Sequence, residues 1–384
     1  MSRAEKPVRV LFVVDSTFPG AGGAEAQARK LGRALTAKGV VLEFVAPRTF
    51  AWQSVDEMVD GVPLHRIKYP LVKVLGAMVL LICFACYLYK RRNDFDVIHV
   101  HITRLLASVA VAMRAITGVP VIAKISGYFE FKGGVLDSEA VNPANAILRR
   151  ILRKIDYVQT ISVETREKLL GAGFKDEQIL FIPNGIDTAE GNESDAKPFE
   201  SSRDSEGPLV FGYCGRLREV KGVHVLIDAF HAFAKNQPKG SVLLRIAGDG
   251  DYYDTLSQRV SDRGLDDCIE FLGNVDDTSS FYRSLDVYVQ PSFAEGLPNA
   301  VIEAMVYRLP VLATNIGGNS DLITHEKEGW LFEAGDAQAL THLMQQCLDQ
   351  RDTLSAVGLM GRKRIVDDYD IDSVTNELMD VYRG

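Results

Sequence analysis

Cysteine is scarce in this sequence, and the spacing of the cysteines does not predict a covalent or metal-held framework. The 384 residues include five cysteines, an odd number, and the pair Cys83 and Cys86 has no second C-x-x-C pair that would complete a zinc site. We therefore expect reduced, structural thiols in a cytoplasmic protein. We also expect no signal peptide, because residues 1–7 are short and polar and an apolar strand follows them directly.

Basic residues are fewer than acidic ones, but the two halves of the chain differ in the sign of their charge. The formal net charge is -8, and 47% hydrophobic with 24% charged residues is the composition of a globular protein. Residues 1–187 contain 25 Lys and Arg against 18 Asp and Glu, whereas the rest of the chain is strongly acidic. This asymmetry predicts that the first half faces an anionic partner. We expect no nucleic-acid partner.

Apolar strands alternate with helical segments along the whole chain, which predicts an α/β fold with parallel sheets. We expect two doubly wound, Rossmann-like domains that face each other across a cleft. The first domain is predicted at residues 1–187, a polar linker at 188–207 and the second domain at 208–365. Residues 366–384 are expected to form a helix that packs back on the first domain.

A glycine-rich loop, residues 20–25, follows the first apolar strand and precedes a helix. In such a unit, Gly22 and Gly23 let the backbone approach a ligand closely. The loop matches the dinucleotide fingerprint poorly, because the third glycine would fall at Glu25, and no acidic residue ends the next predicted strand. The sequence therefore argues against a hydride-transferring enzyme.

In the second half, a predicted strand leads into a loop broken by glycine and proline, and a helix is predicted to begin near Asn299. The unpaired N–H groups at a helix N-terminus suit a phosphate. Glu295 in the loop and Glu303 in the helix suit the hydroxyl groups of a sugar, so a sugar nucleotide would match both features. Taken alone, the two glutamates could equally be a residue that stabilises the helix dipole and an ordinary surface residue.

Two basic residues flank the loop after another predicted strand, residues 209–215. Arg216 can chelate two phosphate oxygens, and Lys221 acts as a point charge. Fixed cations of this kind can stabilise the negative charge on a departing diphosphate without a metal ion. Further ligand contacts are expected in the loops after the next two predicted strands. The first loop contains Gly248, and the second contains Asn274 and Val275 and could meet a base through its backbone.

A histidine, His101, ends the predicted strand 96–101, at the edge where ligands bind in open α/β sheets. Because a single histidine at a strand end is more often structural than catalytic, this position alone carries little weight.

Residues 71–89 are the most apolar stretch of the chain, and a basic triplet follows at 90–92. The stretch approaches the length of a membrane span. However, the strands on both sides look like members of one sheet, whereas a span would place them on opposite faces of a bilayer. We expect a helix that is partly core and partly inserted at an anionic membrane surface through residues 71–92, together with a basic helix at 144–154. A purely buried helix is the alternative.

Taken in order, these motifs resemble retaining glycosyltransferase family 4, the group 1 glycosyltransferases, over nearly the whole chain. The matching elements are Gly22-Gly23, His101, Pro183–Asp187, Gly215-Arg216, Lys221-Gly222, Gly248–Gly250, and Glu295 with Glu303 after seven intervening residues. The resemblance implies the GT-B fold and sugar transfer from a nucleotide-diphosphate sugar with retention of the anomeric configuration. It implies no metal and no other cofactor.

The resemblance also implies roles for individual residues. Arg216 and Lys221 would bind the donor diphosphate, Glu295 would hold the sugar hydroxyls, and Glu303 would hold the ribose. His101 would lie at the reacting centre, so the residues expected to carry catalysis are His101, Glu295, Arg216 and Lys221. The other expected donor contacts come from the glycine loop, the strand-exit loops and the helix start: Gly22, Gly23, Gly248, Asn274, Val275, Gly296, Leu297, Asn299 and Ala300.

Two details limit what the resemblance implies. Many members have a second histidine where this chain has Ser126, so the resemblance assigns no second-histidine role here. The D-x-D motifs at 94–96 and 370–372 match the metal–diphosphate motif of a different glycosyltransferase fold, but neither lies at a predicted strand-exit loop. We therefore expect no metal site.

The expected acceptor is a lipid-linked glycan of bacterial surface polysaccharide synthesis, and the expected location is peripheral, at the inner face of the plasma membrane. Two alternatives stay open at this point. One is a sugar-nucleotide 2-epimerase, or a phosphorylase, on the same two-domain plan. The other is a non-catalytic protein that binds a nucleotide sugar.

Overall fold

The computed structural model describes residues 6–20, 22–137, 143–191 and 207–384, and the chain divides into two compact units. The first unit comprises Met1–Gly185 and Ile371–Gly384, and the second comprises Ile186–Asp370. Most of the expected linker, residues 192–206, lies outside the described residues. Its first part forms a short 3-10 helix, η2 (Thr188–Gly191), that belongs to the second unit.

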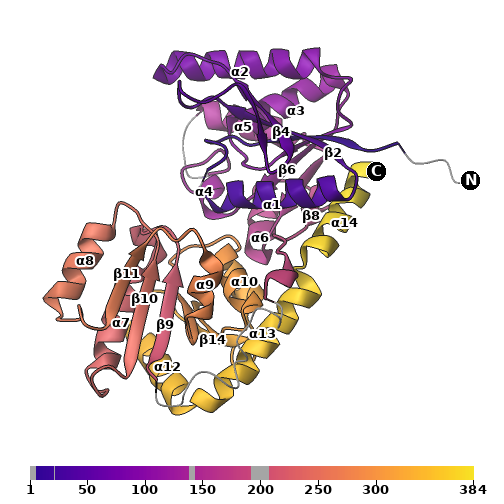
Figure 1. Ribbon diagram of the computed structural model, residues 1–384. Helices are drawn as coiled ribbons and strands as arrows, with labels where there is room; N and C mark the ends of the chain where they lie inside the picture. Colours follow the sequence, from indigo (N-terminus) through magenta and orange to yellow (C-terminus); the bar gives the residue numbers. More distant parts are fainter. Residues whose placement is uncertain (1–5, 21, 138–142, 192–206) are drawn as a thin grey trace, which may run out of the picture. The chain divides into compact units, whose positions relative to one another are not determined.

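The first unit contains an eight-stranded sheet with the order β3-β4-β2-β1-β5-β6-β7-β8 (Figure 1). All neighbouring strands are parallel except β3 and β4, which form an antiparallel hairpin. The strands are β1 (Arg9–Val13), β2 (Val41–Pro47), β3 (Asp56–Val59), β4 (Val62–Ile67), β5 (Val97–Val100), β6 (Val121–Ile125), β7 (Tyr157–Thr160) and β8 (Ile179–Phe181). The helices are α1 (Gly23–Ala37), α2 (Lys73–Lys90), α3 (Leu105–Thr117), α4 (Tyr128–Phe131), α5 (Pro143–Leu152), α6 (Val163–Gly171), the 3-10 helix η1 (Asp176–Gln178) and α14 (Ile371–Arg383).

Helices cover both faces of this sheet. Alternate residues of a strand point to opposite sides, and on both sides they are apolar and pack against helices. On β1, Leu11 and Val13 join a core formed with α2, α3 and α5. Val10 and Phe12 join a second core formed with α1 and α14. Figure 1 shows the same division, with α2 and α3 on one side of the sheet and α1 and α14 on the other.

The C-terminal helix α14 packs on the first unit through an apolar stripe of buried residues at helical spacing, Val374, Leu378 and Tyr382. Its polar side is tied to α1, because Lys38 Nζ lies 3.0 Å from the Asp372 carboxylate. The Tyr382 hydroxyl lies 2.6 Å from His99 Nδ1 inside the core.

The second unit contains a parallel six-stranded sheet with the order β11-β10-β9-β12-β13-β14. The strands are β9 (Leu209–Cys214), β10 (Val242–Ala247), β11 (Ile269–Gly273), β12 (Val287–Gln290), β13 (Val311–Thr314) and β14 (Gly329–Phe332). The helices are η3 (Glu219–Lys221), α7 (Val223–Ala234), α8 (Tyr253–Asp262), α9 (Thr278–Arg283), α10 (Asn299–Val306), α11 (Gly317–Leu322), α12 (Ala337–Asp349), η4 (Arg351–Thr353) and α13 (Leu354–Asp368).

The central strands β9 and β12 of this sheet are hydrogen-bonded neighbours. Because they are parallel, the loops after Cys214 and after Gln290 leave the sheet at the same edge. The strand order therefore places the two loops with the predicted phosphate and sugar contacts side by side.

Candidate active site

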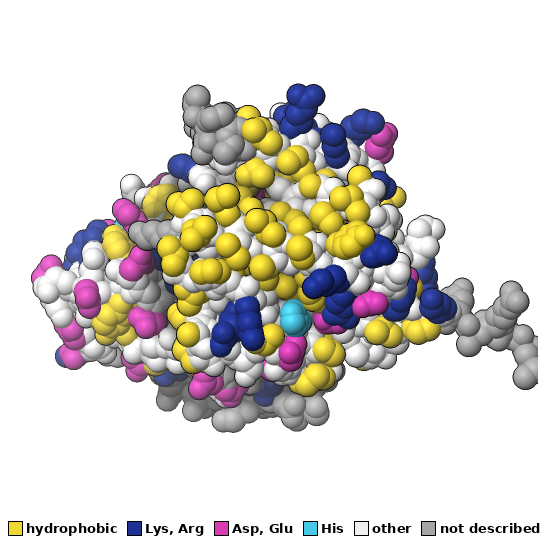
Figure 2. Space-filling view, turned by 90° about the horizontal axis from the view of Figure 1, so that it is seen from above, with side chains coloured by type: hydrophobic (Ala, Val, Ile, Leu, Met, Phe, Trp, Pro, Cys, Tyr) yellow, Lys and Arg dark blue, Asp and Glu magenta, His cyan; other side chains and the backbone are white. Residues whose placement is uncertain are grey.

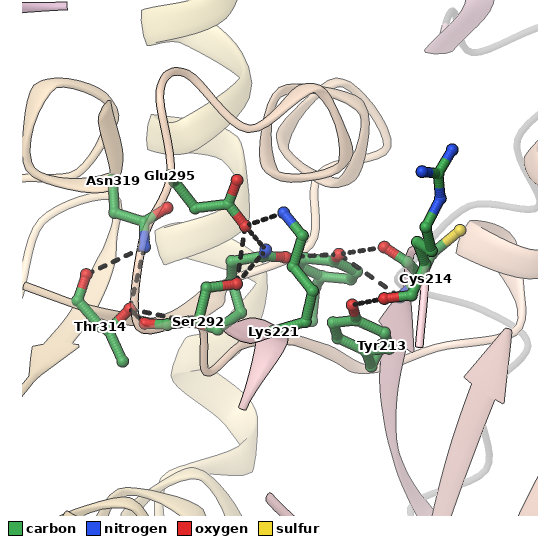
Figure 3. A network of polar contacts seen from close by, with 10 residues as sticks. Tyr213, Cys214, Lys221, Ser292, Glu295, Thr314 and Asn319 are labelled. Carbon is green, nitrogen blue, oxygen red and sulfur yellow. Dashed lines mark hydrogen bonds and ion pairs between the residues drawn. The ribbon is translucent and has the colours of Figure 1, made fainter. Parts of the chain in front are cut away.

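A carboxylate with one shared oxygen and one open oxygen lies in the loop after β12. Glu295 Oε1 accepts hydrogen bonds from Lys221 Nζ and Gln290 Nε2, each at 2.7 Å (Figure 3). Ser292 Oγ donates a third hydrogen bond to the same atom at 2.6 Å. Among the described residues, none donates to Oε2 of Glu295. The predicted pair Lys221 and Glu295 is thus in direct contact, and half of the carboxylate is available to a ligand.

The groups around Glu295 are fixed by the sheet rather than by the loop alone. The Tyr288 hydroxyl lies 2.9 Å from Gln290 Oε1, so it can orient the amide that donates to Glu295. Thr314 Oγ1 on β13 donates to Ser292 O at 2.7 Å, and Asn319 Nδ2 donates to Thr314 O at 3.0 Å (Figure 3). These buried contacts hold the carboxylate in one geometry before a ligand arrives.

The supporting residues Gln290, Ser292 and Thr314 were not predicted from the sequence. A signal for one of them was present, because Gln290 is a polar residue at the end of the apolar strand β12, and it is 3% exposed. A buried polar side chain needs hydrogen-bond partners, so its position at a strand end indicates a role in the adjacent loop.

The loops after β9 and β12 touch each other through their backbones. Phe293 N donates to Val220 O at 2.8 Å. Gly222 has φ +68°, and a Cβ atom at this position would lie 2.0 Å from Pro291 O. Only glycine combines this backbone conformation with this approach, so Gly222 keeps Lys221 beside the loop of Glu295.

Arg216 provides a second positive charge in the loop after β9. Its side chain is exposed, and among the described residues its guanidinium has no hydrogen-bond or ion-pair partner. Gly248, with φ +127°, follows β10, and a Cβ atom there would lie 2.0 Å from Gly215 O. The loop of Gly248 therefore lies against the backbone that carries Arg216, in agreement with the predicted grouping of these positions.

Glu303 lies in α10 and accepts a hydrogen bond from the Tyr282 hydroxyl at 3.0 Å. Burial raises the pKa of Tyr282 well above its ordinary value, and the nearby Glu303 charge raises it further, so the hydroxyl stays protonated and donates. The remaining predicted donor contacts lie at the carboxyl-end edge of this sheet or in the first turn of α10: Asn274, Val275, Gly296, Leu297, Asn299 and Ala300.

In the first unit, the glycine loop leads into α1, but the helix begins earlier than predicted. Gly22 is the N-cap residue and Gly23 the first helical residue, so residues 23–25 of the expected loop are helical. A Cβ atom on Gly22 would lie 2.1 Å from Glu25 Oε2, so a side chain at this position would displace the Glu25 carboxylate. The Glu25 carboxylate therefore fills the space that a side chain on Gly22 would occupy.

His101 follows β5 at the carboxyl-end edge, but its ring is buried, with 1% of the residue exposed. The ring centroid lies 4.1 Å from that of Phe12 and 4.4 Å from that of His99. Burial lowers the pKa of His101 well below its ordinary value and that of His99 to about 3, so both rings are neutral. The contact of His101 with a sugar stays a prediction.

A buried lysine in the same core was not among the predicted site residues. Lys124 on β6 is 3% exposed, and its Nζ atom has no hydrogen-bond partner among the described residues. Burial lowers the pKa of Lys124 to about 7. Its positive form also lowers the pKa values of His99 and His101.

The D-x-D carboxylates make protein contacts in the structure. Asp96 pairs with Arg9 at 2.7 Å, and Asp94 pairs with Arg91 at 2.8 Å. Asp370 accepts from Thr188 Oγ1 at 2.6 Å. In the described ranges, no group of three or more His, Cys, Asp or Glu side chains is arranged to hold a metal ion.

Comparison with known families assigns both halves of the chain. Residues 21–190 match the family model described as Glycosyltransferase Family 4, and residues 195–364 match the model described as Glycosyl transferases group 1. The chain belongs to glycosyltransferase family 4. A sequence relative, the GDP-mannose-dependent alpha-(1-6)-phosphatidylinositol monomannoside mannosyltransferase of Mycobacterium tuberculosis, is 24% identical over 389 residues, 98% of each chain. Glycogen synthase of the same species is 27% identical over 293 residues, 75% of this chain and 68% of the relative.

Solved structures identify the fold of this glycosyltransferase as GT-B. Sucrose-phosphate synthase from Thermosynechococcus elongatus superimposes with a TM-score of 0.81 at 21% identity, over 98% of each chain. Anabaena HepE, crystallised with UDP and glucose, superimposes with a TM-score of 0.79 at 20% identity, over 97% of this chain and 99% of that one. The predicted fold class, two parallel-sheet α/β domains of the GT-B type, is confirmed.

Proposed function

We propose that this glycosyltransferase moves a hexose from a nucleotide-diphosphate sugar to a lipid-linked glycan, with retention of the anomeric configuration and without a metal ion. The observation that carries the proposal is the Glu295 carboxylate, whose Oε1 contacts Lys221 while Oε2 receives no hydrogen bond from the described residues. In the neighbouring strand-exit loop, the Arg216 guanidinium has no hydrogen-bond or ion-pair partner among those residues. A carboxylate that accepts from hydroxyls and a cation pair that neutralises a diphosphate match the two ends of such a donor.

In the proposed reaction, an acceptor hydroxyl oxygen forms a bond to the anomeric carbon while the bond from that carbon to the diphosphate breaks. The departing phosphate oxygen takes the acceptor proton, so no protein nucleophile is needed. Arg216 and Lys221 stabilise the charge that grows on the diphosphate, and Oε2 of Glu295 holds sugar hydroxyls. Glu303 holds the ribose. The configuration is retained because the acceptor hydroxyl attacks the anomeric carbon from the same face that the diphosphate leaves.

The relatives support the donor and acceptor classes. The Mycobacterium tuberculosis relative is named as GDP-mannose-dependent and acts on a phosphatidylinositol monomannoside, which is a glycolipid. The HepE crystals contained UDP and glucose. A further relative from Escherichia coli, 24% identical over 341 residues, is named as a galactosyltransferase that uses UDP-Gal and a diphosphoundecaprenol acceptor.

The donor is tested first by thermal shift with UDP-, GDP- and dTDP-hexoses, because a ligand that binds the native state raises the melting temperature. The stabilising donor is then incubated with a glycolipid extract of the source organism. We expect nucleotide release that depends on the extract, and a product whose NMR coupling constants show the donor's anomeric configuration. An inverted product would overturn retention. A hexose whose configuration changes without any acceptor would identify an epimerase instead.

We further propose that the first unit docks on an anionic membrane surface through α2. On this helix Val74, Met78 and Ile82 follow each other at helical spacing and are 77%, 58% and 61% exposed. Phe84 and Leu88 of the same helix are buried in the core. Figure 2, which views the molecule from the α2 side, shows apolar side chains gathered over this region with Lys and Arg side chains around them. No helix in the described part of the chain has the length and apolarity required to cross a bilayer.

The basic residues contribute less to this surface than the sequence predicts. Arg91 turns to Glu43 and Asp94, and Arg149 donates to the backbone oxygen of Asp137. Lys90 and Arg150 are exposed and are the stronger candidates for contact with lipid headgroups. The apolar face is therefore the main element of the proposed docking surface, and the basic residues add selectivity for anionic lipid.

Sedimentation with vesicles of phosphatidylcholine and phosphatidylglycerol tests the docking surface. The triple variant Val74→Glu, Met78→Glu and Ile82→Glu is expected to stay in the supernatant. The control Met58→Glu adds a charge at an apolar residue of β3 that is 63% exposed, and it should sediment like the wild type. Equal sedimentation of the triple variant and the wild type would remove the membrane proposal.

A further inference from the structure

Two aromatic rings in the first unit are exposed to solvent, although hydrogen bonds order the loop that carries them. Trp52 is 79% exposed and Phe50 is 46% exposed, and they lie between β2 and β3. Their ring centroids are 5.5 Å apart with an interplanar angle of 15°, so they stack on each other. Large exposed aromatic surface is unfavourable in water, and its retention in an ordered loop indicates a binding site.

The polar groups of the same loop face inward and fix its shape. Gln53, which is 5% exposed, accepts a hydrogen bond from Phe50 N at 3.0 Å through its side-chain oxygen. The Arg48 guanidinium donates to Gln53 O at 2.8 Å and to Ala51 O. The loop thus satisfies its own polar atoms around Gln53 and leaves the Trp52 ring in solvent, stacked on Phe50.

Two contacts join this loop to the segment after β1 that leads into the glycine loop. Thr17 and Thr49 share a hydrogen bond between their hydroxyls at 3.0 Å. Arg66, which is 2% exposed, donates to Phe18 O in the loop after β1 at 2.8 Å and to Ser54 O in the aromatic loop at 2.8 Å. A buried arginine therefore connects the two loops, and the aromatic pair is positioned relative to the candidate ligand edge.

The position of the pair in the sheet is also informative. Strands β1, β2 and β5 are parallel neighbours, so the glycine loop, the aromatic loop and His101 all leave the sheet at the same edge. Ligands of open α/β sheets bind beyond this edge. The cations and the carboxylate proposed for the donor belong to the second unit, and the donor contacts predicted in the first unit are Gly22, Gly23 and His101. The aromatic loop, which carries no predicted donor contact, is therefore available to the other substrate.

We propose that Trp52 and Phe50 form a stacking platform for a pyranose ring of the acceptor glycan. This inference rests on the proposed function. One face of a pyranose presents C–H bonds, which pack against the electron-rich face of an indole, while the hydroxyls around the ring stay in water. Tryptophan offers this area with little loss of conformational entropy, because its side chain has two rotatable bonds. The platform therefore suits a sugar ring better than a phosphate, which would need hydrogen-bond donors or cations instead of an apolar ring face.

Kinetics with the full chain test the platform. The donor found by thermal shift and the glycolipid extract are used with Trp52→Ala, Trp52→Tyr and the control Tyr157→Ala. Tyr157 is an aromatic residue that is 39% exposed, and it begins β7 at the opposite edge of the same sheet. We expect Trp52→Ala to raise the acceptor KM about tenfold, the scale of one aromatic contact, and to leave donor KM and acceptor-free donor hydrolysis unchanged. Trp52→Tyr should restore most of the loss, and Tyr157→Ala should match the wild type.

A second readout separates the failure of the platform from the failure of the proposed function. The chain has two tryptophans, and the other, Trp330, is 4% exposed, so quenching of fluorescence by acrylamide reports on Trp52. Oligosaccharide released from the extract by mild acid should protect Trp52 from quenching even if no turnover occurs. An unchanged acceptor KM in Trp52→Ala, or no protection by the oligosaccharide, would overturn the platform. Protection by phosphatidylglycerol vesicles alone would also overturn it, and would assign Trp52 to the membrane surface.

Discussion

Lys221 and Glu295, which are 74 residues apart in the sequence, form an ion pair of 2.7 Å between adjacent strand-exit loops. The carboxylate side chain is 9% exposed and the ammonium side chain 25%. An ammonium has three donors, so Lys221 can hold Oε1 of Glu295 and still donate to a phosphate. In the proposed reaction, the pair would link recognition of the sugar to recognition of the diphosphate.

Glu295→Gln is expected to lower turnover strongly and stability only slightly. The amide oxygen can still accept from Lys221 and Ser292, but the negative charge that we propose receives sugar hydroxyls is lost. We expect kcat/KM for the donor to fall roughly 100-fold, as when one preorganised group at a reacting centre is removed. Activity assays and melting curves should be compared with Glu219→Gln, which changes an exposed glutamate near Lys221. A loss of melting temperature in proportion to the loss of activity would show that Glu295 is structural.

Arg216→Gln is expected to weaken binding of the donor's nucleoside diphosphate by about 10- to 100-fold, the range for a charge-assisted hydrogen bond. The guanidinium has no protein partner among the described residues, so its removal should leave the melting temperature of the free protein unchanged. Arg218→Gln, in the same loop, is the matched control. Calorimetric titration gives the affinities. Similar affinities for Arg216→Gln and Arg218→Gln would argue against a diphosphate contact at Arg216.

The alternation of apolar strands and helices predicted the architecture well. Features that depend on a few polar residues, such as a turn or a hydrogen-bond network, were predicted less well. The antiparallel hairpin β3–β4 was not predicted, although its turn Asp60-Gly61 is a known hairpin signal, and both residues have positive φ. The motif identified Glu295 and Lys221, because their chemistry requires charged residues at fixed positions. Gln290 and Ser292 were missed, although they lie only five and three residues before Glu295, because the loop conformation that turns their side chains onto its carboxylate is not visible in a linear pattern.

Tyr382→Phe tests how firmly α14 is held on the first unit. The substitution keeps the ring and removes the hydroxyl that lies 2.6 Å from His99 Nδ1 in the core. A buried polar atom left without its partner costs about 1–3 kcal/mol, and the free energy of unfolding should fall by that amount. Urea unfolding measures it, with Tyr157→Phe, at an exposed tyrosine, as the control. Equal stability of Tyr382→Phe and Tyr157→Phe would show that this buried hydrogen bond contributes nothing.

Lys124→Met should stabilise the protein, most strongly near neutral pH. Burial lowers the pKa of Lys124 from 10.5 to about 7, so the unfolded state binds more protons than the native state between these values. The stability of the wild type therefore rises as the pH rises from about 7 to 10.5, and the methionine variant lacks this component. At pH 7 the variant should gain up to about 4 kcal/mol, and the gain should shrink toward pH 10.

The control for this prediction is Lys90→Met, which removes an exposed lysine of the first unit and should show no such pH-dependent gain. Denaturant unfolding at pH 7 and at pH 10 gives the four differences in free energy. Because other groups also titrate in this range, the comparison is between variant and wild type at each pH. A gain for Lys124→Met that is the same at both pH values would mean that Lys124 is charged in the native core, since a group charged in both states would contribute no pH dependence.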